Sequence, residues 1–195
     1  TQGIGTAITG RLVGDGFFAV FTGRNETLGR QVEAQNGAES CRFMPCDVGN
    51  EQDVSSLFQV IVRDYGRLDA LVNNAGINRD NVIWKMSARE FDEVINTNLK
   101  GAWLMCREAA KLMKEQQCGR IVNISSRGWL GNFGQTNYAA SKGGMISLTR
   151  VLALELGKYN VLVNVVAPGL IDTPMVSKMP EDARQRLISA QPTKA

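Results

Sequence analysis

The chain has 195 residues, of which 44% are hydrophobic and 21% charged, a balance typical of a globular protein with one domain of ordinary size. It contains 0 histidines, which excludes Ser-His-Asp and Cys-His catalytic pairs, HExxH zinc sites and imidazole acid–base chemistry. Its 22 basic and 19 acidic residues give a mild, scattered net charge of +3, which favours neither nucleic acid nor a membrane surface as a partner. Any proton transfer must therefore use Tyr, Lys, a carboxylate, Cys or water.

The cysteines form neither a CxxC pair nor a ligand cluster; they are Cys41, Cys46, Cys106 and Cys118. This usage is typical of reduced thiols in a cytosolic compartment. No stretch approaches the ~18 apolar residues of a membrane span. We therefore expect a cytoplasmic protein without a metal, a membrane or a nucleic acid.

Helical and strand patterns alternate along the chain. Helices are predicted over residues 6–15, 26–35, 51–64, 88–115 and 136–157. Strands are predicted over 17–21, 41–46, 68–72, 120–124 and 161–166, the first of them a continuous apolar run typical of a strand buried on both faces. The alternation indicates an α/β fold with a parallel sheet covered on both sides. We expect residues 1–195 to form a single domain.

The chain opens on the turn Gly3-Ile4-Gly5 with no strand before it, and it stops after a helical run without a closing strand. We expect a fragment truncated at both ends. A glycine turn that opens a helix suits a phosphate, because free N–H groups and the helix dipole face an anion there, although a purely structural turn has the same sequence. In a dinucleotide-binding fold, an acid at the end of the second strand binds the ribose 2′-hydroxyl. The strand predicted over 17–21 would take that place, and it runs into Arg24-Asn25 with no acid. Arg24 is therefore either a solvated loop residue or a ligand of a 2′-phosphate, and the missing acid favours NADP.

Tyr138 and Lys142 stand four residues apart in a predicted helix and so share one helix face. A free phenol has a pKa near ~10, and a nearby ammonium favours the phenolate and lowers that pKa. The bare YxxxK spacing occurs by chance in many helices. Ser125 and Ser126 end the preceding strand, however, and active sites in α/β proteins lie at the carboxyl ends of parallel strands. The position of the pair therefore favours chemistry.

Taken in order, these motifs resemble the short-chain dehydrogenase/reductase family, of the type that includes 3-oxoacyl-carrier-protein reductases. The resemblance covers essentially the whole chain and depends on Gly3-Ile4-Gly5, Cys46-Asp47-Val48, Asn73-Asn74-Ala75-Gly76, Asn96-Thr97-Asn98-Leu99, Ile124-Ser125-Ser126, Tyr138-x-x-x-Lys142 and Pro168-Gly169-x-x-x-Thr173. It implies a doubly wound parallel sheet of Rossmann type with strand order 3-2-1-4-5-6-7. Because strand 1 precedes this sequence, its two neighbours are expected to lose a ladder partner.

The resemblance implies four catalytic residues. Tyr138 would be the general acid in ketone reduction, and Lys142 would lower its pKa and hold the nicotinamide ribose. Ser126 would bind the substrate oxygen. Asn98, exposed at a kink in its helix, would hold a water that relays protons to Lys142. Ser125 has the family's usual spacing to the tyrosine; strand register favours Ser126, and Ser125 remains the alternative.

The resemblance also implies a cofactor site for NADP, with NAD as the less favoured dinucleotide. The residues expected to line it are Gly3, Ile4, Arg24, Asn25, Asp47, Val48, Asn74, Ala75, Gly76, Tyr138, Lys142, Pro168, Gly169, Ile171 and Thr173. Residues 170–187 would form a substrate lid, in which Met175 and Met179 suit an apolar acyl chain or ordinary packing alike.

The helices over 88–115 and 136–157 would form a dimer interface, usually within a homotetramer. Their apolar residues include Phe91, Val94, Trp103, Met105, Ile146, Leu148 and Val151. The leading hypothesis is an NADP-dependent reductase of 3-oxoacyl thioesters of acyl-carrier protein or coenzyme A. The alternatives are a dehydrogenase of another secondary alcohol, such as a steroid, a sugar or a xenobiotic, and a non-catalytic dinucleotide-binding subunit.

Overall fold

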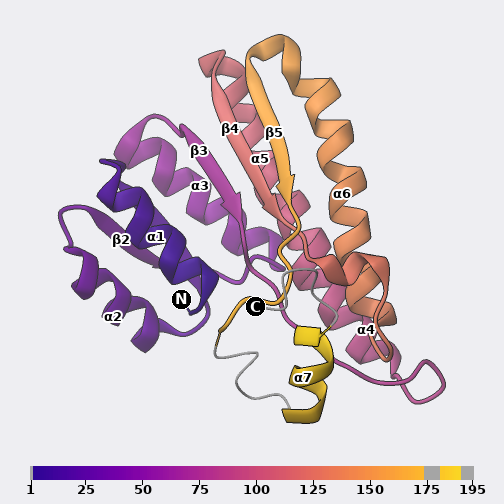
Figure 1. Cartoon of the computed structure of the whole chain (residues 1–195). Helices are drawn as coiled ribbons and strands as arrows, with labels where there is room; N and C mark the ends of the chain where they lie inside the picture. The colour runs from indigo at the N-terminus through magenta and orange to yellow at the C-terminus, as the bar shows by residue number, and fades with distance from the viewer. Residues whose placement is uncertain (1, 174–180, 190–195) are drawn as a thin grey trace. The chain divides into compact units, whose positions relative to one another are not determined.

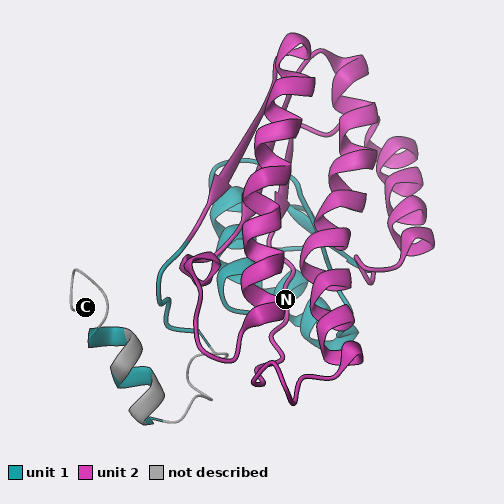
Figure 2. Cartoon of the chain, turned by 90° about the vertical axis from the view of Figure 1, so that its right-hand side faces the viewer, with its two compact units in different colours: residues 1–45, 168–195 teal, residues 46–167 magenta. Residues whose placement is uncertain are grey.

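The computed structural model describes residues 2–173 and 181–189, in which helices and strands alternate (Figure 1). The helices are α1 (Ile4–Gly14), α2 (Glu26–Asn36), α3 (Glu51–Tyr65), α4 (Ala88–Ile95), α5 (Gly101–Gln116), α6 (Thr136–Leu156) and α7 (Glu181–Ser189). The strands are β1 (Ala19–Gly23), β2 (Cys41–Pro45), β3 (Ala70–Asn73), β4 (Gly119–Ile124) and β5 (Val161–Val166). Three short helical segments are η1 (Asn96–Lys100), η2 (Arg127–Leu130) and η3 (Gly157–Tyr159). The chain divides into two compact units, residues 1–45 with 168–195 and residues 46–167 (Figure 2).

In the first unit, β1 and β2 form a parallel pair in which Ala19 lies opposite Cys41. The rings of Phe21 and Phe43 pack with their centroids 5.5 Å apart. Gly29 of α2 lies directly against the Phe43 ring, so a side chain at this position would displace the ring. Close contact of a helix with the sheet is thus the reason for a glycine inside α2.

The first strand begins later than its apolar run predicts. The chain leaves α1 through a turn in which the Phe17 N–H donates to the Leu12 carbonyl at 3.0 Å, so the ladder starts only at Ala19. Phe17 and Phe18 are each 45% exposed, and only Ala19 of the strand is buried. The prediction of a strand buried on both faces is therefore wrong at this place.

In the second unit, β3, β4 and β5 form a parallel sheet in that order, with Ala70 opposite Arg120 and Gly119 opposite Val161. Helices α5 and α6 pack against this sheet (Figure 1). The fully buried side chains of this unit include Leu104, Met113, Ile121, Met145 and Val161. The parallel strands and the helices packed on them confirm the predicted α/β architecture.

Within the described residues, β1 pairs with β2 alone and β3 pairs with β4 alone. Each of these strands therefore has one edge whose N–H and C=O groups make no strand ladder.

The long helix predicted over 88–115 is divided into three parts. It starts at a capping box in which Ser87 and Glu90 bind each other's backbone N–H groups. A π-helical segment, η1, then separates α4 from α5. A π-helical segment has hydrogen bonds between residues i and i+5, one residue further apart than in an α-helix, and such segments are frequent at functional sites. Here it carries Asn98.

The apolar residues expected at a dimer interface do not share one environment. Val94 is fully buried within the chain and Met105 is 8% exposed, so both belong to the core of their own unit. Phe91, Trp103 and Val151 are exposed, at 39–51% of their surfaces. None of the helices in the described part of the chain is long and apolar enough to cross a membrane.

Candidate active site

The second unit gathers polar side chains where its parallel strands end. β3 ends at Asn73, and β4 ends at Ile124, immediately before Ser125 and Ser126. The chain returns through η2 into α6, whose first turn carries Tyr138 (Figure 1). Because parallel strands share one carboxyl edge, the topology brings these segments together.

Lys142 is buried on α6 with only 4% of its surface exposed. Its Nζ donates to the Ile124 carbonyl oxygen at 2.7 Å, which ties α6 to the end of β4. Burial lowers the pKa of this ammonium to about 8. An ammonium has three donors, and a Cβ built on Gly76 would lie 3.6 Å from Nζ. The glycine therefore keeps the space beside the ammonium clear.

Asn98 is fully buried, so the expectation of an exposed side chain at this kink is wrong. Its Oδ1 accepts from the Ile77 N–H at 2.8 Å, and its Nδ2 donates to the Ile77 carbonyl at 3.0 Å. The same Nδ2 lies 3.2 Å from the Ser141 hydroxyl, which in turn donates to the Tyr138 carbonyl at 2.7 Å. The Asn98 side chain thus joins the loop after β3 to α6, and both its oxygen and its nitrogen take part in these bonds.

Tyr138 is a largely buried phenol whose ring centroid lies 5.7 Å from the Lys142 Nζ. Burial raises its pKa most, a hydrogen bond with Ser126 lowers it, and the charge of Asp80 raises it further. The net pKa is raised, contrary to the expectation that Lys142 lowers it. The reason is that Lys142 turns its ammonium toward the Ile124 carbonyl and that both groups are desolvated.

The two candidate serines differ clearly in their surroundings. The Ser126 hydroxyl accepts from the Gly128 N–H at 3.1 Å and hydrogen-bonds the Tyr138 phenol. Ser125 is 3% exposed, and its hydroxyl donates to the Lys142 carbonyl at 2.8 Å. Ser126 therefore lies beside the phenol, whereas Ser125 fixes the backbone of α6.

The asparagine motif after β3 has a structural and an open part. Asn73 is buried, and its Nδ2 donates to Asn123 Oδ1 at 2.8 Å; Asn123 in turn donates to Thr149 at 2.9 Å. Asn74 and Gly76 are half-buried and Ala75 is exposed. Asn73 thus belongs to a polar network in the core, whereas residues 74–76 form the partly exposed start of the loop after β3.

Several cofactor candidates lie in the first unit. Gly3 is the N-cap of α1 with φ of 54°, and the first turn, which begins at Ile4, has no side-chain cap and no acidic residue. These free N–H groups fit a phosphate. Arg24 is exposed directly after β1. The Asn25 Oδ1 accepts from the Leu28 N–H at 3.0 Å and so caps α2.

The other cofactor candidates follow β2 and β5. The Asp47 carboxylate accepts from the Gly49 N–H at 3.0 Å, and Val48 is 9% exposed beside Gly101. Pro168 and Thr173 are half-buried, and Gly169 and Ile171 are exposed. Met175 and Met179 of the expected lid lie outside the described residues.

The sequence analysis missed three polar residues around Tyr138. Gln135 and Asn137 are both buried, and Asn137 accepts from the Tyr138 N–H at 2.7 Å. Asp80 accepts from Gln135 Nε2 at 3.1 Å. Polar residues immediately before a catalytic-candidate tyrosine were the available signal, but nothing in the spacing of Asp80 shows that its loop folds onto α6. The described residues contain no cluster of three or more His, Cys, Asp or Glu side chains able to hold a metal ion.

The depressed pKa of Lys142 predicts a specific pH dependence of stability. Because the folded pKa of about 8 lies below the ordinary lysine pKa of 10.5, the unfolded chain binds more protons between these two values. The free energy of unfolding should therefore rise from pH 8 to 10.5, by up to about 3 kcal/mol. We expect Lys142→Met to remove this rise in denaturant unfolding at several pH values. The exposed Lys100→Met is the control and should retain it; an equal rise in both variants would contradict the assignment.

Comparison with known proteins gives one consistent result. The short chain dehydrogenase family model matches residues 1–184. The chain is 47% identical over 147 residues, 75% of its length, to the (2S)-[(R)-hydroxy(phenyl)methyl]succinyl-CoA dehydrogenase subunit BbsD of Thauera aromatica. It is 46% identical, also over 75% of its length, to a 3-oxoacyl-[acyl-carrier-protein] reductase of Thermotoga maritima, and 43% identical over 92% to an acetoacetyl-CoA reductase of an Acinetobacter species.

The chain spans 59% and 60% of the first two of these relatives and 75% of the third. The family match implies a nicotinamide dinucleotide as cofactor. Together, the parallel α/β architecture and the match over residues 1–184 show that the chain belongs to the short chain dehydrogenase family.

Proposed function

We propose that this protein reduces the ketone of a 3-oxoacyl thioester, carried by coenzyme A or by acyl-carrier protein, with NADPH as the hydride donor. The observation that carries the proposal is the grouping of a phenol, a serine hydroxyl and a buried ammonium at one sheet edge: Tyr138, Ser126 and Lys142. Relatives named for the reduction of 3-oxoacyl-carrier protein and of acetoacetyl-CoA support this substrate class.

The proton of the reaction comes from the protein. When bound, NADPH supplies a hydride for the carbonyl carbon. Tyr138 donates its proton to the carbonyl oxygen, so that the ketone becomes a secondary alcohol and the phenol becomes a phenolate. The raised pKa keeps this phenol protonated at neutral pH. Solvent returns the proton to Tyr138 before the next turnover.

The remaining residues position the reactants. Lys142 would hold the ribose hydroxyls with donors beyond the one that binds Ile124. Asn98 holds the loop carrying Gly76 against α6 and so preserves the distance between that loop and the Lys142 ammonium. Ser126 donates to the substrate oxygen as negative charge develops there. This is catalysis by orientation and electrostatics, in which the protein supplies no electrons.

The preference for NADPH rests on the first unit. The uncapped first turn of α1 at Gly3 and Ile4 would receive the pyrophosphate. Arg24 would bind the 2′-phosphate through its planar guanidinium, and no acid competes at this strand end. Asn25 would contribute through its backbone or Nδ2, since its Oδ1 caps α2.

The remaining cofactor contacts are proposed by family position. Asp47 and Val48 would flank the adenine, Asn74 and Ala75 would line the ribose, and the segment 168–173 would hold the carboxamide. In that segment the contacting residues would be Pro168, Gly169, Ile171 and Thr173.

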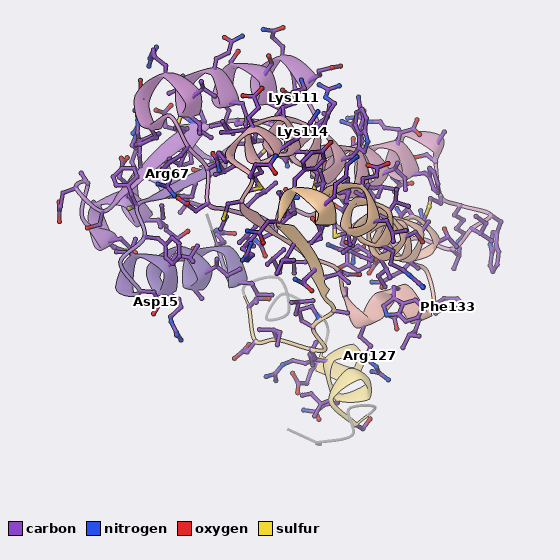
Figure 3. The ribbon with its side chains drawn as sticks, turned by 90° about the horizontal axis from the view of Figure 1, so that it is seen from above. Asp15, Arg67, Lys111, Lys114, Arg127 and Phe133 are labelled. Carbon is purple, nitrogen blue, oxygen red and sulfur yellow. The ribbon has the colours of Figure 1, made fainter. Side chains whose placement is uncertain are left out.

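A second candidate is oxidation of a bulky 3-hydroxyacyl-CoA. A relative 47% identical is named as a dehydrogenase subunit for a phenyl-bearing succinyl-CoA. The loops after β3 and β4 carry exposed aromatic side chains, Trp84 at 75%, Trp129 at 44% and Phe133 at 88%, the last at the outer edge of the ribbon in Figure 3. Such rings suit an aromatic acyl group. Dehydrogenation of a steroid, sugar or xenobiotic alcohol, or a non-catalytic dinucleotide-binding role, has no comparable support.

We also propose that residues 1–195 belong to one dinucleotide-binding domain, supported by the family match over 1–184. A homodimer or homotetramer is proposed from the exposed apolar side chains of α5 and α6, Trp103, Val151 and Leu154. Four free cysteines, three of them buried, support a reducing, cytoplasmic compartment.

Tyr138→Phe tests the proton donor. We expect the rate of acetoacetyl-CoA reduction to fall by about 10³-fold, because general acid catalysis is lost while the ring and its packing remain. NADPH binding, followed by fluorescence, should change little. Normal turnover by the Phe variant would refute the assignment, and Tyr159→Phe is the control for loss of a phenol elsewhere.

Ser126→Ala and Ser125→Ala form a matched pair. Ser126→Ala should lower kcat by about 10²-fold, since it removes a donor to the developing oxyanion. Ser125→Ala should mainly lower the free energy of unfolding by about 1 kcal/mol, because it deletes a buried hydrogen bond. If Ser125→Ala gave the larger loss of kcat, Ser125 would be the substrate-binding serine.

Arg24→Ala tests the choice of dinucleotide. The variant should bind NADPH about 10-fold or more weakly, because a charge-assisted contact to the 2′-phosphate is lost, and it should bind NADH as before. Titrations of both dinucleotides measure this, with the exposed Arg150→Ala as the charge-matched control. An unchanged ratio of the two affinities would remove Arg24 from the site.

A further inference from the structure

Asp80 lies on the loop after β3 and reaches the segment that begins α6. Its Oδ2 accepts from Gln135 Nε2 at 3.1 Å. The Gln135 Oε1 accepts from Asn132 Nδ2 at 3.0 Å, so both ends of this amide are held. Asp80 is exposed whereas Gln135 is only 8% exposed. A solvent-facing carboxylate therefore fixes a buried amide.

Two further bonds join the same loop to the same segment. The Asn81 N–H donates to the Gly134 carbonyl at 2.9 Å. Asn137 Nδ2 donates to the Arg79 carbonyl at 2.9 Å. Residues 79–81 thus form three consecutive contacts with residues 134–137, and we call this arrangement the α6 latch.

The latch acts directly before Tyr138. Gln135 is the N-cap of α6, and its side chain makes no cap hydrogen bond because it is turned toward Asp80 instead. Its carbonyl accepts from the Ala139 N–H at 2.8 Å, and Asn137 Oδ1 accepts from the Tyr138 N–H at 2.7 Å. The two bonds that fix the backbone on either side of Tyr138 are thus made by Gln135 and Asn137, which both belong to the α6 latch.

Asp80 also carries a negative charge on the loop that is bonded to the turn before Tyr138. Its negative charge raises the pKa of Tyr138. The other ionisable groups near the start of α6 are engaged elsewhere: Arg79 with Glu93, Glu90 with Ser87, and Lys142 with the Ile124 carbonyl. Exposed Arg127 of η2, labelled in Figure 3, is not among the causes of the Tyr138 pKa.

We propose that Asp80 is a positioning residue for Tyr138, which holds the first turn of α6 through Gln135 and places a negative charge on the loop that is bonded to that turn. The meaning of this role for turnover rests on the proposed reductase function. A carboxylate there disfavours the phenolate, so it keeps the phenol in its proton-donating form. Its removal favours the phenolate, the form that accepts a proton when an alcohol is oxidised.

The test separates the charge from the hydrogen bond. Asp80→Asn removes the charge and keeps an oxygen that accepts from Gln135, whereas Asp80→Ala removes both. Asp92→Asn, on the exposed surface of α4, is the control with the same change in net charge. Phenolate formation is followed by ultraviolet absorbance, and subtraction of the matching Tyr138→Phe spectrum isolates Tyr138 from the other two of the 3 tyrosines. Circular dichroism verifies folding of each variant.

We expect Asp80→Asn to lower the ionisation midpoint of Tyr138 by about half a pH unit, the effect of removing one partly screened charge. The shift should shrink in 1 M salt, which a purely structural change would not explain. Asp92→Asn should leave the midpoint in place. An unchanged midpoint in Asp80→Asn, or an equal shift in Asp92→Asn, overturns the electrostatic role.

The hydrogen-bonding role is measured by turnover. Asp80→Ala should lower kcat for acetoacetyl-CoA reduction several-fold below that of Asp80→Asn, with a smaller change in KM, since the phenol loses its orientation while the substrate pocket remains. Equal kcat values for the two variants overturn this role. The titration needs no activity, so a protein that fails to reduce ketones would sink the proposed function and leave the inference about Asp80 to be decided by the absorbance measurement.

Discussion

The side-chain amide of Asn98 is the contact on which the geometry of the site depends. It meets both backbone groups of Ile77 and the hydroxyl of Ser141, and so joins the loop after β3 to α6. A fully buried amide left without partners would cost about 1–3 kcal/mol, so alternative arrangements of these segments are penalised. The π-helical turn is the backbone device that presents this amide inward, since a regular α-helix would carry its side chains on a different angular path.

Burial then determines the chemistry of the groups that this framework holds. Burial disfavours the charged form of both Lys142 and Tyr138. It therefore lowers the pKa of the Lys142 ammonium to about 8 and raises the pKa of the Tyr138 phenol. The simple picture of an ammonium one helical turn away lowering the phenol's pKa neglects this common desolvation. The Ser126 hydrogen bond is the contact that does favour the phenolate.

The sequence was sufficient where local rules determine structure. Helix ends agree with the capping residues Asn50, Gly66 and Ser87, and the parallel pairing of the strands agrees with the alternation of helices and strands. It was insufficient where distant segments compete. Whether Phe17 joins a strand depends on a turn bond to Leu12, and whether Asn98 is exposed depends on Ile77, twenty-one positions away. Hydrophobic periodicity predicts neither of these contacts, and sequence spacing does not show that Asp80 meets Gln135.

The direction of the reaction is a separate question from the identity of the fold. Relatives named as reductases and as a dehydrogenase subunit share this chain's family, and an enzyme leaves the equilibrium between ketone and alcohol unchanged. What the protein does control is the protonation of Tyr138 at a given pH. The proposed proton donor has a raised pKa and so stays protonated near neutrality, which is the form that a reduction would require; an oxidation would require the phenolate.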